Sequence, residues 1–200
     1  LKKKQRKLLR RYFTREIFPV LTPLAFDPGH PFPHISNLSL NLAIVVRDPV
    51  RGELFARLKI PDLFPRLLPI PREEEAADYE ELGLLSNTSD TYVWIEEVIA
   101  ANLSQLFPGL DVVAAYPFRV TRDADIEIEE DEASDLLIAI EDGVEQREFG
   151  SAVRLEVGTA MPKALLHFLM EKLGVAPYQV FAANVPLAMR DLMELTNIHR

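Results

Sequence analysis

Residues 18–48 read FPVLTPLAFDPGHPFPHISNLSLNLAIVVRD, and the rest of the chain is organised around this stretch. Its first half contains five prolines: Pro19, Pro23, Pro28, Pro31 and Pro33. Because each proline fixes φ and lacks a backbone N–H, this half suits neither a helix nor an inner strand, and we predict an extended loop. A proline-stiffened loop of this length is usually functional or packed against something, so we expect it to face a surface outside this chain.

The second half of the stretch contains no proline and is mostly apolar. Residues 40–47 form a short apolar run rich in Ile and Val, which predicts a buried strand. The turn DPVRG follows, and residues 53–60 predict a second strand that completes a hairpin. Alternation along this second strand predicts one core face, and a second face with Arg57 and Lys59 that is wet or contacts a partner.

Beyond the hairpin, strand and helix patterns alternate along the chain. We predict strands at residues 92–93, 111–121 and 152–157, and helices at residues 95–106, 162–173 and from Pro186 onward. Pro117 indicates an edge position or a bulge in its strand, and Gly174 is placed to end its helix. Residues 62–90 predict an exposed loop. The fold class we expect is α+β: two layers, a mixed mainly antiparallel sheet of about four or five strands, and helices packed on one face.

Residues 1–17 predict a basic amphipathic helix. Its apolar positions recur at helical spacing, and Lys or Arg fills most of the others. The favoured interpretation is a docking helix with a solvated charged face. Binding of this face to an anionic polymer or a membrane surface is the alternative.

Composition restricts the function classes. The 200 residues contain no cysteine, which excludes disulfides, thiolate zinc sites and cysteine nucleophiles from this segment. A formal net charge of -9 argues against a general nucleic-acid binder. No apolar run is long enough to cross a bilayer, and we expect a cytoplasmic protein. The chain begins with Leu1 inside a helical pattern, which suggests a piece of something longer.

Three kinds of side chain are candidate sites. Residues 123–129 alternate acids with apolar residues, so a strand there would align four carboxylates that could recruit Mg²⁺, although solvated, helix-capping acids are the favoured interpretation. His30 and His34 are assigned a structural role, and His167 is expected to be a half-buried side chain of its helix. Four arginines are candidates for a polyanion path, although salt bridges to nearby acids are the favoured interpretation: Arg119, Arg122, Arg57 and Arg154.

Four longer motifs occur in order along the chain. They are FPVLTPLAFDPGHPFPHISNLSLNLAIVVRDP, YVWIEEVIAANLSQLFPG, PFRVTRDADIEIEEDEASDLL and FGSAVRLEV. Together they resemble the middle, or head, domain of the long, histidine-phosphorylating polyphosphate kinases. The resemblance covers essentially the whole chain. It implies that residues 1–17 are the end of a preceding helical domain or a linker helix, and that residues 18–200 are the head domain.

The resemblance also implies a function. The full enzyme would transfer the terminal phosphate of ATP reversibly to polyphosphate through a phosphohistidine, with ATP and Mg²⁺ bound outside this chain. No catalytic, cofactor or metal residue of the family maps onto this sequence, so the chain would be non-catalytic and serve oligomer contact and the architecture of the active-site tunnel. Its partners would be the N-terminal and C-terminal domains of the same chain, further copies in a homo-oligomer, and polyphosphate, with membrane association through the full enzyme.

Interdomain contacts are expected at Pro31, Phe32, His34 and Asn37. The alternative is a free-standing anion-binding or polyphosphate-binding regulatory module.

Overall fold

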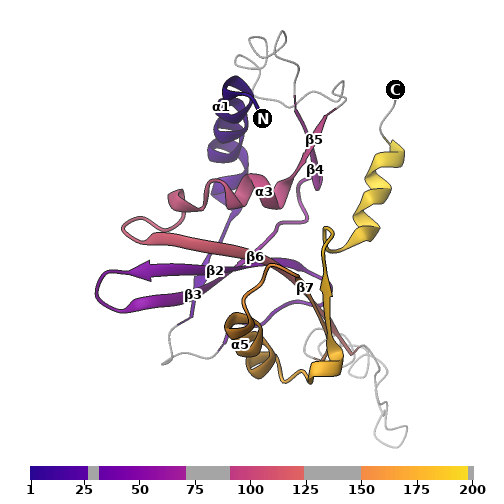
Figure 1. Ribbon diagram of the computed structural model, residues 1–200. Helices are drawn as coiled ribbons and strands as arrows, with labels where there is room; N and C mark the ends of the chain where they lie inside the picture. The colour runs from indigo at the N-terminus through magenta and orange to yellow at the C-terminus, as the bar shows by residue number, and fades with distance from the viewer. Residues whose placement is uncertain (27–31, 71–90, 124–149, 198–200) are drawn as a thin grey trace, which may run out of the picture. The chain divides into compact units, whose positions relative to one another are not determined.

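The computed structural model describes residues 1–26, 32–70, 91–123 and 150–197. The chain folds into two compact units. Unit 1 consists of Leu1–Gly29, Leu42–Ala115 and Ala188–Arg200, and unit 2 of His30–Asn41 and Tyr116–Leu187. Figure 1 shows the elements of each unit. Among the described residues, no helix is long and apolar enough to cross a membrane.

The predicted basic helix is confirmed at the start of unit 1. Helix α1 spans Lys3–Tyr12 and continues into a π-helical turn, η1 (Phe13–Ile17), and a 3-10 turn, η2 (Phe18–Val20). Its buried apolar side chains are Leu8, Leu9, Phe13 and Ile17. Burial of this stripe fixes the helix on unit 1 and leaves the Lys and Arg face outward.

The proline-rich stretch is more structured than an extended loop. Pro19 lies in the first turn of η2, where its missing N–H would have no partner in any case. Leu24–Ala25 form a two-residue strand, β1, antiparallel to β3 (Gly52–Lys59). A segment as short as β1 fits between prolines, and β1 is the first strand in the sheet order, so it is extended and not an inner strand. The prediction of an extended loop was wrong only at the 3-10 turn η2.

The predicted hairpin is present. Strand β2 (Leu40–Asp48) lies next to β3, and Asp48 Oδ1 accepts the N–H groups of Val50 and Arg51 at 2.7 and 2.8 Å. These hydrogen bonds hold the pKa of the Asp48 carboxyl below its usual value. The prediction of a wet second face on β3 was wrong, because Phe55 and Arg57 are buried.

A second, two-stranded sheet of unit 1 was not predicted. Strand β4 (Leu67–Pro69) pairs antiparallel with β5 (Tyr92–Trp94), and all three residues of β4 are buried. The prolines around β4 indicated an exposed loop, but a three-residue strand needs few donors. Residues 71–90, the remainder of that predicted loop, lie outside the described residues.

The helix that follows β5 is shorter than predicted. Helix α3 spans Ile95–Ala100, and a separate 3-10 turn, η3, spans Leu103–Gln105. Asn102 lies between them, and its side-chain amide donates to the carbonyl oxygen of Val98 at 2.8 Å. Side-chain hydrogen bonds of this kind compete with the helical backbone, which explains the interruption.

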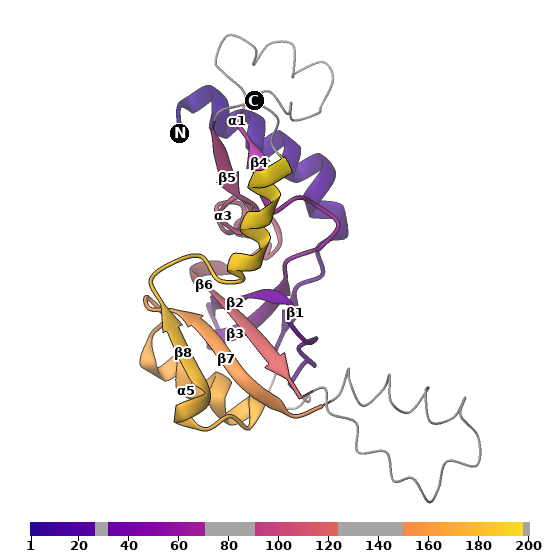
Figure 2. The same cartoon turned by 90° about the vertical axis from the view of Figure 1, so that its right-hand side faces the viewer.

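Unit 2 is built on the second half of β6 (Asp111–Arg122), β7 (Ala152–Gly158) and β8 (Val180–Ala183). Strand β7 pairs antiparallel with β6 and parallel with β8. Helix α5 (Lys163–Leu173) lies beside one face of β7 and β8 in both views (Figure 2). The core of this unit includes Phe118, Val120, Leu155 and Leu169, all at 0% exposure.

Strand order in the larger sheet is β1-β3-β2-β6-β7-β8, with β4 and β5 in a sheet of their own. The mixed, mainly antiparallel α+β class with an N-terminal helix is therefore confirmed. Strand β6 has two neighbours, so Pro117 does not mark an edge strand. The ladder to β7 begins at Phe118, one residue after Pro117, and its register shift lies between Thr121 and Arg122. Pro117 therefore precedes that ladder and removes no donor from it.

The C-terminal segment differs from the predicted helix at Pro186. The structure shows a 3-10 helix, η5 (Met189–Asn197), that begins three residues later. Ala188, immediately before it, has a positive φ of 52°. In α5, Leu169 is buried and Leu165 and Leu166 are intermediate, so the leucines of this helix are only partly covered.

Gly174 ends α5 as predicted, with φ 68° in the left-handed region. Replacement by alanine is expected to lower the free energy of unfolding by about 1–2 kcal/mol, because nothing lies within 4 Å of the added Cβ and only backbone strain is introduced. Urea denaturation measures the change. Gly158→Ala is the matched control, since an added Cβ there would make an ordinary 3.7 Å contact with Pro117. Equal losses in both variants would contradict the role of φ.

Candidate functional site

The candidate site of unit 2 is the face of β6, β7 and β8 opposite the core. The register pairs Arg119 with Glu156 and Glu156 with Phe181 across the three strands. Because side chains alternate along a strand, Val120 and Leu155 point to the core, whereas these three side chains share the other face. Figure 2 looks toward β7 and β8 with α5 behind them.

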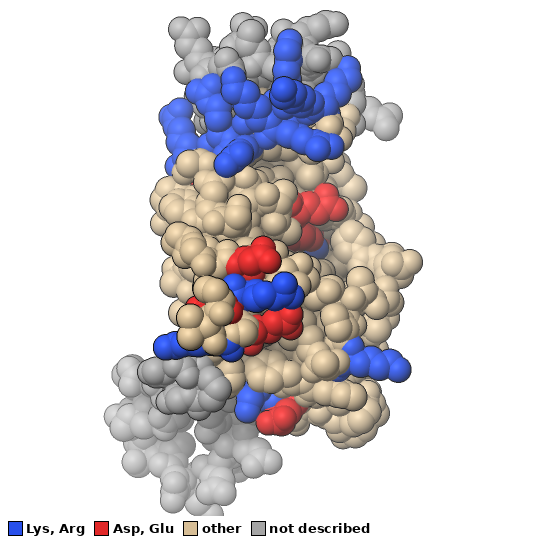
Figure 3. All heavy atoms as spheres, turned by 60° about the vertical axis from the view of Figure 1, so that its left-hand side comes forward, with Lys and Arg blue, Asp and Glu red and all other residues tan. Residues whose placement is uncertain are grey.

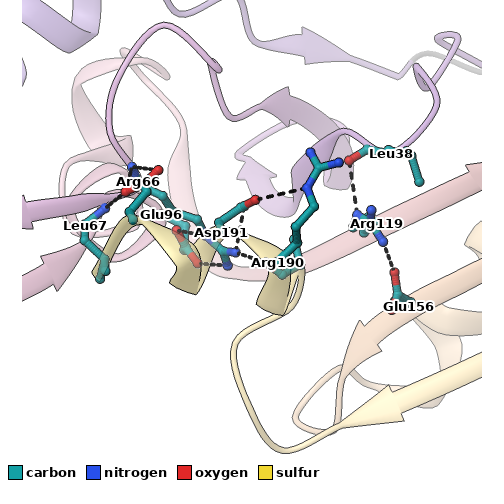
Figure 4. A network of polar contacts seen from close by, with 10 residues as sticks. Leu38, Arg66, Leu67, Glu96, Arg119, Glu156, Arg190 and Asp191 are labelled. Atoms are coloured by element: carbon teal, nitrogen blue, oxygen red, sulfur yellow. Dashed lines mark hydrogen bonds and ion pairs between the residues drawn. The ribbon is translucent and has the colours of Figure 1, made fainter. Parts of the chain in front are cut away.

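Two predicted arginines meet on this face at one carboxylate. Arg119 Nη1 lies 2.6 Å from Glu156 Oε2, and Arg154 Nη2 lies 3.2 Å from Glu156 Oε1. The side chains of Arg119 and Glu156 are 15% and 18% exposed, and that of Arg154 is 43% exposed. The Arg154 guanidinium also lies over the Phe181 ring at 3.8 Å. Arg154 is therefore the member of this cluster most accessible to an anion, and Arg119 is held by Glu156 (Figure 4).

Arg122 is directed at the backbone. Its Nε donates to the carbonyl oxygen of Ile35 and its Nη1 to that of Gly150, both at 2.7 Å. Its own N–H donates to Asn37 Oδ1 at 2.8 Å. Burial lowers the pKa of the Arg122 guanidinium. Through these hydrogen bonds, Arg122 connects residues 35–37 to the end of β6 and to the residues just before β7.

The residues predicted to contact other domains lie in the same part of unit 2. Phe32 packs edge-on against Phe168 of α5, with ring centroids 5.9 Å apart. Asn37 accepts from Arg122 as described, and His34 is exposed. Pro31 lies outside the described residues. Phe32 and Asn37 thus have contacts within unit 2, and His34 lies at the surface.

Arg57, the fourth predicted arginine, belongs to unit 1 and is not brought to this face. Its side chain lies in β3 and the residue is 7% exposed. Burial lowers the pKa of the Arg57 guanidinium. A buried cation of this kind is poorly placed to meet a polymer in solution.

The sequence did not indicate Arg66, which is the centre of a buried polar network in unit 1 (Figure 4). Its Nη2 lies 2.7 Å from Glu96 Oε1 and its Nη1 lies 3.1 Å from Asp191 Oδ2, and the Arg66 and Glu96 side chains are 7% and 10% exposed. Nη1 also donates to the carbonyl oxygen of Ala188 at 2.9 Å, and the guanidinium lies 4.9 Å from the centroid of the Trp94 ring. The only local hint of a buried role for Arg66 is its position as a single charged residue between Pro65 and an apolar run.

This network attaches η5 to the two-stranded sheet of β4 and β5. Burial acts to lower the pKa of the Arg66 guanidinium, but hydrogen bonding and charge from Glu96 and Asp191 outweigh it and raise that pKa. Glu194 of η5 adds a second attachment, because its carboxylate accepts the backbone N–H groups of Arg66 and Leu67 at 3.0 and 3.2 Å.

Most of the remaining predicted site residues lie outside the described part of the chain. His167 is exposed on α5, so the prediction of a half-buried ring was wrong. His30 and His199 lie outside the described residues, as do all but one of residues 123–129. Among the residues that are described, no group of His, Cys, Asp and Glu could hold a metal ion.

Comparison with known proteins identifies the family to which this chain belongs. The profile of the polyphosphate kinase middle domain matches residues 4–195. The chain therefore belongs to the polyphosphate kinase family, as its middle domain.

Individual relatives agree with this assignment. The chain is 48% identical over 195 residues to a polyphosphate kinase of Aphanizomenon baltica, covering 96% of this chain and 49% of that protein. It is 46% identical over 201 residues to polyphosphate kinase 1 of Chlorobaculum tepidum, covering 100% and 28%. A crystal structure of a polyphosphate kinase from Porphyromonas gingivalis shares the fold with a TM-score of 0.71 at 22% identity, over 96% of this chain and 25% of that one. The chain thus spans a quarter to a half of the length of these proteins.

Proposed function

We propose that the full protein containing this chain is a polyphosphate kinase that transfers the terminal phosphate of ATP reversibly to polyphosphate through a phosphohistidine. The observation that carries this proposal is the match to the polyphosphate kinase middle domain over residues 4–195. Because the relatives extend well beyond the matched region, we assign the phosphohistidine and the ATP and Mg²⁺ contacts to other parts of the full chain. Phosphoryl transfer relies on positioning and charge neutralisation, which several domains can share.

In this proposal the chain itself is non-catalytic. It contributes to contacts between subunits of an oligomer and forms part of the wall of the active-site tunnel. Exposed side chains in β8, the last strand in the sheet order, and in the residues on either side of it support the contact role. Tyr178, Phe181 and Val185 are large, apolar and exposed. Exposed apolar groups that gather in one place commonly mark interaction surfaces. The exposed His34 and its neighbours in residues 31–37 would contact the adjoining domains.

Polyphosphate contact in the tunnel is assigned mainly to Arg154. A guanidinium suits phosphate oxygens, and Arg154 is the most exposed of the cluster. Arg119 and Arg122 act as positioning residues, since each is held by contacts inside unit 2. Buried Arg57 is the weakest of the four as a contact.

The activity test uses the full protein with γ-labelled ATP and Mg²⁺, and follows incorporation of label into acid-insoluble polymer. The full protein is expected to make polyphosphate, whereas the chain described here, folded by circular dichroism, makes none. Synthesis by this chain with its four histidines replaced would contradict the non-catalytic role. A full protein that binds polyphosphate in a salt-dependent way but makes none would favour the alternative, a regulatory anion-binding module.

A further inference from the structure

The outer face of α1 and η1 carries the densest positive charge of the protein. Eight Lys and Arg residues precede Glu16, the one carboxylate of residues 1–17, although the whole chain has a net charge of -9. Figure 3 shows a dense band of Lys and Arg atoms at the top of the face that it displays, whereas lower on this face Lys and Arg atoms occur in separate groups, several of them beside Asp and Glu atoms. We use the name basic face for five exposed members of this group: Lys3, Lys7, Arg10, Arg11 and Arg15.

Helical geometry brings these cations together. Residues three and four apart are neighbours on a helix, so Lys7, Arg10 and Arg11 lie side by side. A shallow hollow of about 290 Å³ is lined by Lys7, Arg10, Arg11, Thr14 and Arg15. Among the described residues, four cations and a hydroxyl therefore line one concave surface.

The helix that carries the hollow is held in unit 1 by hydrogen bonds and by packing of its apolar side chains. Thr14 Oγ1 lies 2.9 Å from the carbonyl oxygen of Arg10 and 3.1 Å from Oε1 of Gln105 in η3. On the opposite side of the helix, Leu8, Leu9, Phe13 and Ile17 are buried in unit 1. The cations are thus presented by a helix that packing already holds in place, which lowers the ordering cost of binding.

The same packing restricts the class of ligand. An amphipathic helix binds a membrane by burying its apolar side in the lipid, but here that side is used in the core of unit 1. Base recognition in nucleic acids relies on groups that pair with base edges or stack on them, whereas the hollow offers cations and one hydroxyl. A flexible chain of phosphates, with charge on every unit and no bases, requires only such donors.

We propose that the basic face is a binding site for a linear inorganic polyphosphate chain that lies along α1 and η1. From Lys3 to Arg15 the face extends roughly 18 Å at the helical rise per residue, enough for several consecutive phosphates. The identity of the polymer rests on the proposed function, whereas the location of the site rests on the charges and the hollow. The face would hold the polymer close to the enzyme during successive transfers.

The test measures polyphosphate affinity of the full protein that contains this chain, by anisotropy of end-labelled polyphosphate in rising KCl without ATP. The variant carries Lys7→Gln, Arg10→Gln and Arg11→Gln. A Lys or Arg near an anionic surface contributes about a fivefold gain in affinity, so an overall loss of about 100-fold is expected. The salt slope should fall by about 2, as for single-stranded polyanions. The matched control removes three other surface cations of unit 1, Arg47, Arg51 and Lys59, in the same way and should retain its affinity.

Two outcomes would overturn the proposal. One is unchanged affinity in the triple variant whose circular dichroism and melting temperature match the parent. The other is binding of single-stranded DNA or phosphatidylserine vesicles at the basic face with the affinity of polyphosphate, which would assign the face to another polyanion. Polyphosphate synthesis by the unchanged full protein is measured separately, so failure of the site and failure of the proposed function are distinguished.

Discussion

Replacing Arg66 with alanine is expected to lower the free energy of unfolding by about 3–5 kcal/mol, the usual cost of removing one partner of a buried ion pair. The side chains of Arg66 and Glu96 are 7% and 10% exposed, so the remaining Glu96 carboxylate would stay buried without its cation. The carbonyl oxygen of Ala188 and the Asp191 carboxylate would lose the same donor. Chemical denaturation measures the loss, and amide hydrogen exchange should show early opening of η5.

Two companion variants separate this mechanism from a general sensitivity of the region. Arg190→Ala removes a neighbouring cation with an 81% exposed side chain, and a change within about 0.5 kcal/mol is expected. Arg66→Met combined with Glu96→Met removes both charges, and should recover much of the loss because a buried pair replaced by apolar groups is often nearly neutral. A loss below 1 kcal/mol in Arg66→Ala would mean that the network contributes little.

The second large effect is expected for Glu156→Gln, which keeps the shape of the side chain and removes its charge. Glu156 accepts from Arg119 at 2.6 Å and from Arg154 at 3.2 Å, so two charge-assisted hydrogen bonds are weakened. We expect a loss of about 1.5–3 kcal/mol in the free energy of unfolding, the range for hydrogen bonds to charged groups. Urea denaturation gives this value.

The same variant tests the role of the arginine cluster in binding. Without the Glu156 charge, Arg119 and Arg154 are left with an uncompensated positive charge, and affinity of the full protein for polyphosphate should rise. Arg154→Gln is the matched comparison: its 43% exposure predicts a stability change below about 1 kcal/mol, together with weaker polyphosphate binding. A fall in affinity for Glu156→Gln, with the fold intact, would remove this face from the proposed tunnel wall.

Much of the fold could be predicted because its signals are local. Apolar spacing in residues 1–17 predicted α1, and a continuous Ile and Val run predicted β2. Gly174 was assigned to the end of α5 because glycine adopts a positive φ without strain. In contrast, β4 and β1 are only three and two residues long, too short for any periodicity to be read.

Less of the candidate site could be predicted. Arg119, Arg122 and Arg154 were predicted as candidates because guanidinium groups suit phosphate oxygens. That β6 and β7 are neighbours, and that their register pairs Arg119 with Glu156, came only from the structure. The sequence contained no information on which arginine would face solvent. Arg57 looked outward by alternation, but both faces of β3 are covered, so its side chain is buried.

By itself the sequence determined the basic helix, the main strands and the family, since these depend on residues close together in the chain or on long motifs. Only the tertiary structure decided which charges meet. Arg66 contacts Asp191 across 125 positions, and Arg122 reaches the carbonyl of Ile35 across 87. The physical reason is that an ion pair or a hydrogen bond forms where packing of the intervening elements places two groups within about 3 Å, and local sequence patterns do not specify that distance.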